Sequence, residues 1–376
     1  PDDADWTTTR SVNLSITSPV ATRVAIYTDA SCTDASLLTE LPVSDVAKNI
    51  RLDVAKADRA LYIQYATSKG KEMMNIPLNT ASTRAETLVK LPENVSGFDT
   101  NGGEGAYRYQ WYPAKGETAT LMMEDNWPEM GDYDFNDFVI WYHAQAIFFD
   151  GGNGSKDSYD ADGVEFEITF RAMGGYLPYR LGLQLDQTSA KYIDEVIEIN
   201  GNDLVKMELQ NPGEDAPAIF IFTGTDQLRK QNNGGTFYNT EADHQIAAND
   251  LVTIKYRLKM NCFRSLEKTK ALWAAATSEN QNFFLQKEKN GGREIHLRGY
   301  EPTAYYSGSY AGEAGNNMRS DIKYCSTDNF VWGIKVPVKL AHPREKTDIM
   351  KVYGKFRSWI TNPNLSLDSP EDYNEN

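Results

Sequence analysis

Short segments in which apolar and polar residues alternate recur along this chain, and this pattern constrains its fold more than any other feature. In the first part of the chain, residues 12–18 and 23–29 alternate, and residues 61–67 and 73–78 alternate more loosely. Turn-forming residues separate these runs. Alternation with period two at short spacing is typical of antiparallel sheets that have one face toward water. The pattern predicts an Ig-like β-sandwich over residues 1–95.

The β pattern continues after a stretch that has no periodicity. Residues 92–105 are rich in Gly, Asn and acidic side chains, so we expect a linker at residues 96–105 and a second domain at residues 106–362. Val, Ile, Phe, Tyr and Trp dominate the strand-like segments of this second part. These segments are residues 118–124, 137–149, 163–173, 179–185, 218–224, 251–260 and 329–340. They predict a larger β-sandwich or a jelly-roll-like domain.

One segment near the C-terminus has helical periodicity. Apolar residues form one stripe along residues 344–360, and Pro343 suits the first turn of a helix. The members of the stripe are Ile349, Val352, Tyr353, Phe356, Trp359 and Ile360. The predicted fold is therefore mostly β with one C-terminal α-helix, which covers a face or an edge of a sheet. Residues 363–376 are predicted to be a fraying acidic tail.

The composition excludes several classes of protein. The net charge of −15 argues against binding to nucleic acid or to anionic lipid, because no dense cluster of Lys and Arg is present to neutralise phosphates. The same charge suits divalent cations. No apolar run approaches the ~18 residues of a membrane helix, so no transmembrane segment is expected in this chain. The first residues lack the features of a signal peptide, as a mature chain also would.

The cysteines indicate neither a zinc site nor a disulfide scaffold. The chain contains Cys32, Cys262 and Cys325, and none of them has the CxxC spacing of a zinc site. Three cysteines are too few for a disulfide scaffold. Cys262 and Cys325 fall in the same half of the chain and could pair, although we favour free buried thiols.

The stretch from residue 124 to residue 137 concentrates negative charge before an apolar strand. Carboxylates this crowded repel one another unless a cation lies among them, and Ca²⁺ takes 6–8 oxygen ligands. The D-x-D-x-N beginning matches an EF-hand loop, but the turn glycine and the bidentate Glu are missing, so we reject an EF-hand. The alternative is a cluster of turns and caps, which explains one or two acidic residues better than six. We predict a calcium site formed by Asp132, Asp134, Asn136 and Asp137, with Glu124 and Asp125 as further ligands.

A second acidic loop follows the strand. Asp157, Asp160 and Asp162 lie within residues 150–163 and are candidates for another metal site. The loop is also rich in Gly and Ser, and a solvated hairpin loop is the alternative that we favour.

Two further features bear on catalysis and on ligand binding. Glu294 and His296 lie two residues apart, so in a strand both would face one side, where they could act as a general acid and base. A satisfied polar patch is the interpretation that we favour for this pair. Four tyrosines lie among small residues and form a possible ligand surface for sugars or proteins, although packing explains many tyrosines. They are Tyr300, Tyr305, Tyr306 and Tyr310.

Several segments resemble the LruC domain family. The stretch EDNWPEMGDYDFNDFV at residues 124–139 resembles the signature of that family. Supporting segments agree with the family in order and spacing, and they are residues 171–185, 234–241, 292–303, and 328–337 followed by 342–360. The resemblance implies an envelope protein of a Gram-negative bacterium, either secreted or anchored as a lipoprotein in the outer membrane, in which a small β-sandwich often precedes the LruC-type domain. It carries no established activity.

The function predicted from these observations is that of a non-enzymatic cell-envelope protein, stabilised by Ca²⁺, with a role in surface binding or adhesion. Its partner would be a surface glycan or a protein of the envelope or of an appendage. The first alternative is a carbohydrate-binding module that captures polysaccharide. The second alternative is a hydrolase with an unrecognised active site.

Overall fold

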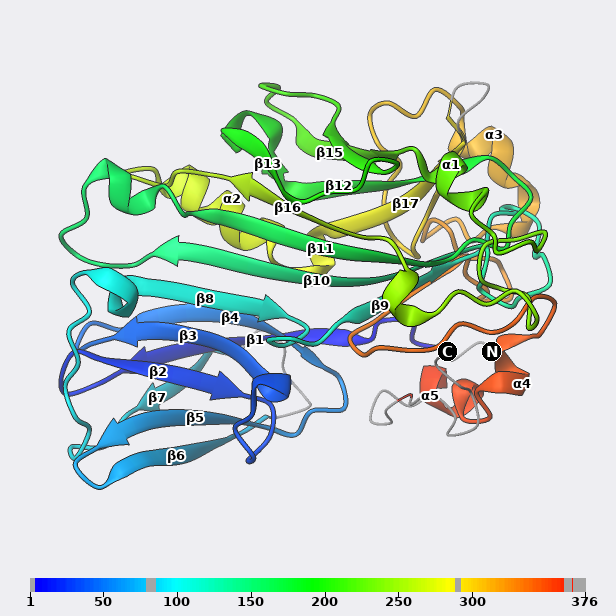
Figure 1. Cartoon of the computed structure of the whole chain (residues 1–376). Helices are drawn as coiled ribbons and strands as arrows, with labels where there is room; N and C mark the ends of the chain where they lie inside the picture. Colours follow the sequence, from blue (N-terminus) through cyan, green and yellow to red (C-terminus); the bar gives the residue numbers. More distant parts are fainter. Residues whose placement is uncertain (1–3, 79–85, 288–291, 362–366, 368–376) are drawn as a thin grey trace.

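The computed structural model describes residues 4–78, 86–287, 292–361 and 367. Its described part is built mainly from strands, which confirms the mostly β prediction (Figure 1). The strands before residue 95 are β1 (Thr9–Thr17), β2 (Thr22–Tyr27), β3 (Leu37–Val43), β4 (Lys48–Ala55), β5 (Ala60–Thr67), β6 (Gly70–Pro77) and β7 (Glu86–Lys90).

The strands after residue 105 include all those that alternation predicted, together with several short ones. They are β8 (Tyr107–Tyr112), β9 (Ala119–Met123), β10 (Phe138–Phe149), β11 (Gly163–Ala172), β12 (Tyr179–Ser189), β13 (Glu195–Asn200), β14 (Lys206–Leu209), β15 (Pro217–Thr223), β16 (Thr253–Lys259), β17 (Gln281–Lys287), β18 (Glu294–His296) and β19 (Gly333–Val336). The α-helices are short, and they are α1 (Thr225–Arg229), α2 (Leu266–Ala275), α3 (Tyr310–Ala314), α4 (Ile349–Val352) and α5 (Phe356–Thr361).

The strands form three sheets. The largest has eleven strands in the order β13-β16-β11-β10-β8-β3-β2-β5-β6, with β9 beside β10 and β19 beside β9. A three-stranded sheet has the order β4-β1-β7, and a five-stranded sheet has the order β14-β15-β12-β17-β18. Nearly all neighbours are antiparallel; β1 and β7 are a parallel pair. The large sheet therefore has room for both smaller sheets to pack against it.

The three-stranded sheet covers the end of the large sheet that is built from the first strands. Leu14 of β1 and Leu52 of β4 pack in one core with Ile26 of β2 and Ile63 of β5. These side chains are buried because they occupy alternate positions of their strands, as the period-two pattern predicts. The first seven strands thus form a two-layer sandwich.

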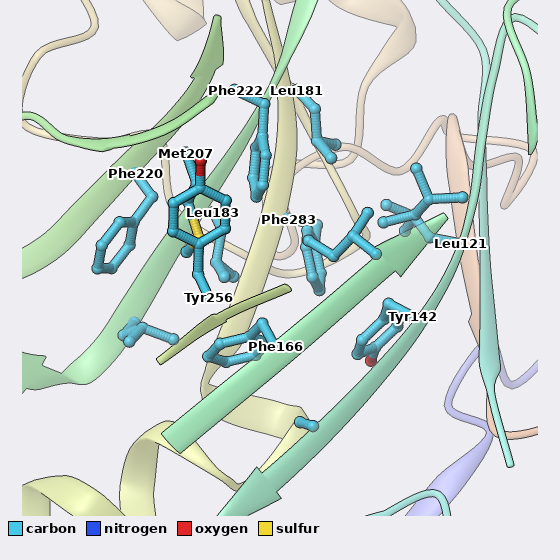
Figure 2. Packing of buried hydrophobic residues seen from close by; sticks show 14 of the residues in the cluster. Leu121, Tyr142, Phe166, Leu181, Leu183, Met207, Phe220, Phe222, Tyr256 and Phe283 are labelled. Carbon is cyan, nitrogen blue, oxygen red and sulfur yellow. The ribbon is translucent and has the colours of Figure 1, made fainter. Parts of the chain in front are cut away.

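The five-stranded sheet covers the other end. Figure 2 shows Tyr142 of β10 and Phe166 of β11 on one side of the core, facing Leu183 of β12, Phe220 of β15 and Phe283 of β17. Tyr142 and Phe283 lie in ring contact, with centroids 4.9 Å apart. Burying such aromatic side chains provides much of the stabilisation of a core of this kind.

Strand β8 joins the two sandwiches. Gln110 pairs with Thr39 of β3 on one side and with Ala146 of β10 on the other, so the large sheet runs on without a break. Directly opposed residues of neighbouring strands share a face, so both smaller sheets lie over the same face of the large sheet. The predicted boundaries at residues 95 and 106 stay a prediction, and the linker leads into a strand that both sandwiches share.

The prediction of one continuous helix over residues 344–360 is wrong. The apolar stripe is buried as expected, but the segment forms only α4 and α5, separated at Gly354. Its first residues are not helical because Lys346 has φ 60° and its backbone N–H donates to Asp134 Oδ2 at 2.8 Å. A left-handed residue interrupts a right-handed helix. The charged start of the segment is therefore bound to the acidic stretch.

Helices α4 and α5 pack against the first residues of the described chain. Trp6 and Phe356 lie with ring centroids 6.1 Å apart, in a cluster that also includes Phe135 of the acidic stretch. All three cysteines are free, as we favoured; Cys262 and Cys325 are buried. Among the described residues, none of the helices combines the length and apolarity that a membrane crossing needs.

Candidate metal centre

The acidic stretch is the connection of a β-hairpin. Strand β9 ends at Met123, β10 begins at Phe138, and these two residues are paired antiparallel partners. The fourteen residues between them are far more than the two to five of an ordinary hairpin loop. Long ordered loops of this kind are usually functional.

Aromatic side chains fix this loop to the body of the protein. Trp127 is fully buried and stacks on Tyr310 with centroids 5.3 Å apart. Phe135 is also fully buried. The ring centroid of Tyr133 lies 4.7 Å from that of Phe135 and 5.2 Å from that of Phe330. Tyr133 and Phe135 therefore anchor the loop. Their φ angles of 61° and 56°, however, show that the segment is coiled and not extended.

The coiled loop brings three carboxylates together, which we call the acidic centre: Glu124, Asp132 and Asp134. One oxygen from each lies within 4.8 Å of the others. Asp134 Oδ1 accepts from the Asn136 N–H at 3.1 Å, and Glu124 Oε1 accepts from the Phe135 N–H at 2.6 Å. Glu124 and Asp134 are buried, whereas Asp132 is exposed. The centre is thus held by backbone amides and opens to solvent at Asp132.

The second oxygen of Glu124 is the anomaly of the centre. Glu124 is fully buried, yet its Oε2 atom has no hydrogen-bond partner within the described chain. Burial, together with repulsion from Asp134 and Asp132, raises the pKa of Glu124 to about 8. Burial and the neighbouring Asp132 likewise raise the pKa of Asp134 to about 7. A buried carboxylate oxygen without a donor is costly unless a cation or a proton compensates for it.

Asp125 and Asp137 form a separate carboxyl pair. The Asp125 N–H donates to Asp137 Oδ2 at 2.8 Å, and the Leu177 N–H donates to Asp125 Oδ2 at 3.3 Å. Burial, with repulsion from Asp125 and Glu124, raises the pKa of Asp137 to about 10. A proton shared between Asp125 and Asp137 would relieve the repulsion of this buried pair. The six predicted ligands do not converge on a single point as a set.

From the sequence we did not recognise three residues beside these carboxyl groups, which are Glu345, Gly174 and Gly175. Glu345 lies near the acidic centre, with one oxygen 3.0 Å from the position that a Cβ atom of Gly174 would occupy. Asn136 Oδ1 lies 2.1 Å from that same position and has no hydrogen-bond partner within the described chain. Gly175 in turn lies against Asp125 and Asp137. The adjacent pair of glycines was the available signal, because glycines allow close approach of the backbone to such groups.

Gly175→Ala tests this close approach. The new Cβ atom would lie 2.0 Å from Asp125 Oδ2, so the carboxyl pair must shift. We expect the free energy of unfolding in urea to fall by about 1–3 kcal/mol. Gly102→Ala is the matched control, because nothing lies within 4 Å of its added Cβ. Equal effects of the two substitutions would contradict the assigned packing.

The donor set of the acidic centre fits calcium. Two ligands of one Ca²⁺ ion are at most about 5 Å apart, since each lies 2.3–2.6 Å from the ion. The separations within 4.8 Å satisfy this limit. All the donors are oxygens, which suits a hard cation rather than zinc. Glu124, Asp132 and Asp134 would hold the ion, and Asn136 and water could complete its shell.

The structure does not bring together the residues of the second acidic loop. Asp157 is exposed on a short 3₁₀ turn, and Asp160 pairs with Lys259 at 3.4 Å. Asp162 is buried and accepts from the N–H groups of Phe149 and Cys262 at 2.7 and 3.3 Å. Within the described ranges, no metal-sized group of three acidic, His or Cys side chains includes them.

Glu294 and His296 form a buried polar network. Neither side chain is exposed, and His296 Nε2 lies 3.0 Å from Glu294 Oε2. His296 Nδ1 lies 2.6 Å from Asn282 Oδ1, and the Thr303 hydroxyl donates to Glu294 Oε1 at 2.8 Å. Burial lowers the pKa of His296, against the opposing influence of Glu294. The network matches the satisfied polar patch that we favoured.

The four tyrosines do not form one surface. Tyr305 is exposed, and its hydroxyl donates to Glu214 at 3.0 Å. Tyr310 stacks on Trp127, and its hydroxyl accepts from the Tyr324 N–H at 2.9 Å. The Tyr300 hydroxyl donates to the Glu279 carbonyl at 2.9 Å, and the Tyr306 hydroxyl is buried. Packing within the protein therefore accounts for three of the four.

Comparisons with known proteins place this architecture in a family. The family model described as "Domain of unknown function (DUF4842)" matches residues 161–366, which is more than half of the chain. The chain belongs to this family. It is similar in structure to a crystal structure described as a "Putative lipoprotein from Bacteroides ovatus", with a TM-score of 0.68 and 22% sequence identity over 92% of this chain and 95% of that one. No curated protein matches.

Proposed function

We propose that this chain is a non-enzymatic binding protein of the bacterial cell envelope in which Ca²⁺ at the acidic centre locks the loop between β9 and β10. The observation that carries the proposal is the fully buried Glu124 carboxylate, whose Oε2 atom has no donor while Asp132 and Asp134 lie beside it. A divalent ion removes the repulsion among these carboxylates and satisfies the open oxygen.

The locked loop would hold distant parts of the chain together. The Lys346 N–H donates to Asp134, and the Arg293 side chain donates to the Trp127 carbonyl at 3.1 Å. Trp332 Nε1 also donates to a carbonyl of the loop, that of Glu129, at 2.7 Å. Calcium at the acidic centre would therefore stabilise the C-terminal segment and the hairpin through one site. Such a ligand stabilises the folded state by mass action.

The envelope location draws on two likenesses. The similar structure is described as a "Putative lipoprotein", and the resemblance to the LruC family implies an envelope protein of a Gram-negative bacterium. We extend that location, secreted or anchored at the outer membrane, to this chain. We propose a role in surface binding or adhesion, which suits that location; the burial of the Glu294–His296 pair argues against its use as an active site.

Metal analysis and calorimetry test the metal assignment. The EDTA-stripped protein, titrated with CaCl₂, is expected to bind one Ca²⁺ at the acidic centre with a Kd of about 10⁻⁶–10⁻⁴ M, and to bind Mg²⁺ at least about tenfold more weakly. Asp134→Asn is expected to remove this binding. Asp157→Asn is the matched control, because Asp157 is exposed and lies outside the centre. Binding that survives in Asp134→Asn, or no calcium binding by the wild type, would refute the assignment.

A further inference from the structure

A polar cleft of about 580 Å³ lies where the two smaller sheets meet above the large one. Its floor is formed by Arg108 and Gln110 of β8, the strand that joins the sandwiches. One wall comes from the three-stranded sheet and the other from β12, α2 and the residues after α2. Ligand sites of 300–1,000 Å³ occur preferentially at such junctions. We call this space the inter-sheet cleft.

The lining of the cleft is unusual for this acidic chain. Two cationic side chains, Arg108 and Lys270, face it together with one acidic side chain, Glu86, whereas the third lining cation, Arg51, is ion-paired with Glu279. The remaining excess of one positive charge contrasts with the net charge of −15 for the whole chain. A concave surface of one sign attracts ligands of the opposite sign. The cleft therefore favours an anion.

Arg108 is the residue that most requires a partner. It is only 5% exposed, and its Nε atom has no hydrogen-bond partner within the described chain. One terminal nitrogen donates to Gln110 Oε1 at 2.6 Å, and the guanidinium carbon lies 3.7 Å from the centroid of the Trp273 ring. No carboxylate of the described residues forms an ion pair with it. A guanidinium fixed in this way presents a planar donor to an anion.

The remaining lining carries amide groups. The side chains of Asn13, Gln187 and Asn280 line the cleft, and within the described ranges they make no hydrogen bond. An amide can donate and accept at once, which matches the hydroxyl groups of a sugar ring. The half-buried Trp273 adds an apolar aromatic edge, against which a sugar ring can pack. Charge, amides and an aromatic ring together are more specific than a site for a bare anion.

We propose that the inter-sheet cleft binds an anionic oligosaccharide, with Arg108 and Lys270 contacting its acidic group and the amide side chains contacting its hydroxyls. This inference rests on the proposed binding role, for which it names the class of ligand. It does not involve the acidic centre, so the two can fail separately. The four tyrosines that the sequence offered for such a role lie elsewhere, apart from the lining of this cleft.

Calorimetry with defined oligosaccharides tests the inference. The probes are tri-galacturonic acid and a hyaluronan hexasaccharide for carboxylated sugars, a heparin hexasaccharide for sulfated sugars, maltohexaose as the neutral sugar, and sodium sulfate as the bare anion. At least one acidic oligosaccharide is expected to bind at least about tenfold more tightly than maltohexaose and sulfate. Its affinity is expected to fall as the salt concentration rises. Equal binding of the neutral sugar, binding of sulfate as tight as that of any sugar, or no binding at all would overturn the inference.

Variants connect the binding to the cleft. Arg108→Gln is expected to lower the affinity for the acidic oligosaccharide by about tenfold or more. Lys270→Gln changes an exposed residue of α2, so it should fold normally and weaken binding by about threefold. Arg59→Gln, an exposed cation outside the cleft, is the control and should bind as the wild type does. Asp134→Asn should lose calcium but keep the oligosaccharide. Unchanged binding in both Arg108→Gln and Lys270→Gln would overturn the inference.

Discussion

Calcium is expected to raise the melting temperature of the EDTA-stripped protein more at pH 8.5 than at pH 6.5. In the metal-free native state the pKa of Glu124 is about 8 and that of Asp134 is about 7, whereas both groups are ionised in the unfolded chain above pH 6. The native state therefore binds more protons, and its stability falls as pH rises through these pKa values. Bound calcium takes the place of these protons, so it restores the stability that the native state loses as the pH rises.

The expected difference in the calcium-induced rise is on the order of 2–5 °C, from about 1.4 kcal/mol per unit of pKa and about 1–2 °C per kcal/mol for a chain of this length. At each pH, the melting temperature without calcium is subtracted from that with calcium. This difference removes the contributions of groups outside the centre. One such group is Lys335, whose pKa burial lowers to about 8. Burial lowers the pKa of His342 to about 3, so this side chain stays neutral across the window. Differential scanning calorimetry gives the result, and a rise that does not depend on pH would contradict it.

Glu294→Ala is expected to lower the free energy of unfolding by about 3–5 kcal/mol, because it removes one half of a buried pair. Glu294 accepts from the Thr303 N–H and hydroxyl, both at 2.8 Å, and lies 3.0 Å from His296 Nε2. The truncation leaves these groups buried without an acceptor, which costs more than the loss of the bonds themselves. Urea unfolding of the variant measures the loss.

Glu294→Gln is the matched control for this second prediction. The amide keeps the shape and one acceptor oxygen, so we expect it to cost clearly less than the Ala substitution. If instead Glu294→Ala left stability within about 0.5 kcal/mol of the wild type, the pair would not be structural. The alternative of a hydrolase that uses Glu294 and His296 would then gain support.

The strands could be predicted well because their evidence is local. Alternation reports which face of a strand is buried, and the segments at residues 137–149 and 163–173 became β10 and β11 almost residue for residue. The segment at residues 344–360 shows the limit of this approach. Its apolar stripe is buried as predicted, but Lys346 is held by Asp134, more than two hundred residues away in the chain. Tertiary hydrogen bonds of this kind override a helical pattern.

The metal centre could be predicted in its residue types but not in its grouping. The density of carboxylates marked the stretch, and Glu124, Asp132 and Asp134 do come together. The course of the loop could not be predicted, because Tyr133 and Phe135 adopt left-handed backbone conformations that the sequence does not indicate. Asp125 and Asp137 lie outside this group of three and contact each other. Glu345 could not be placed there from its sequence, since only the fold brings it near.

A crystal structure grown with calcium, with an anomalous difference map, tests the central claim most directly. We predict one peak among Glu124, Asp132 and Asp134, with an oxygen of each at about 2.3–2.6 Å from the ion and with Glu124 Oε2 among the ligands. The absence of a peak at saturating calcium, with these oxygens turned to solvent or bonded only to amide groups, would contradict the account.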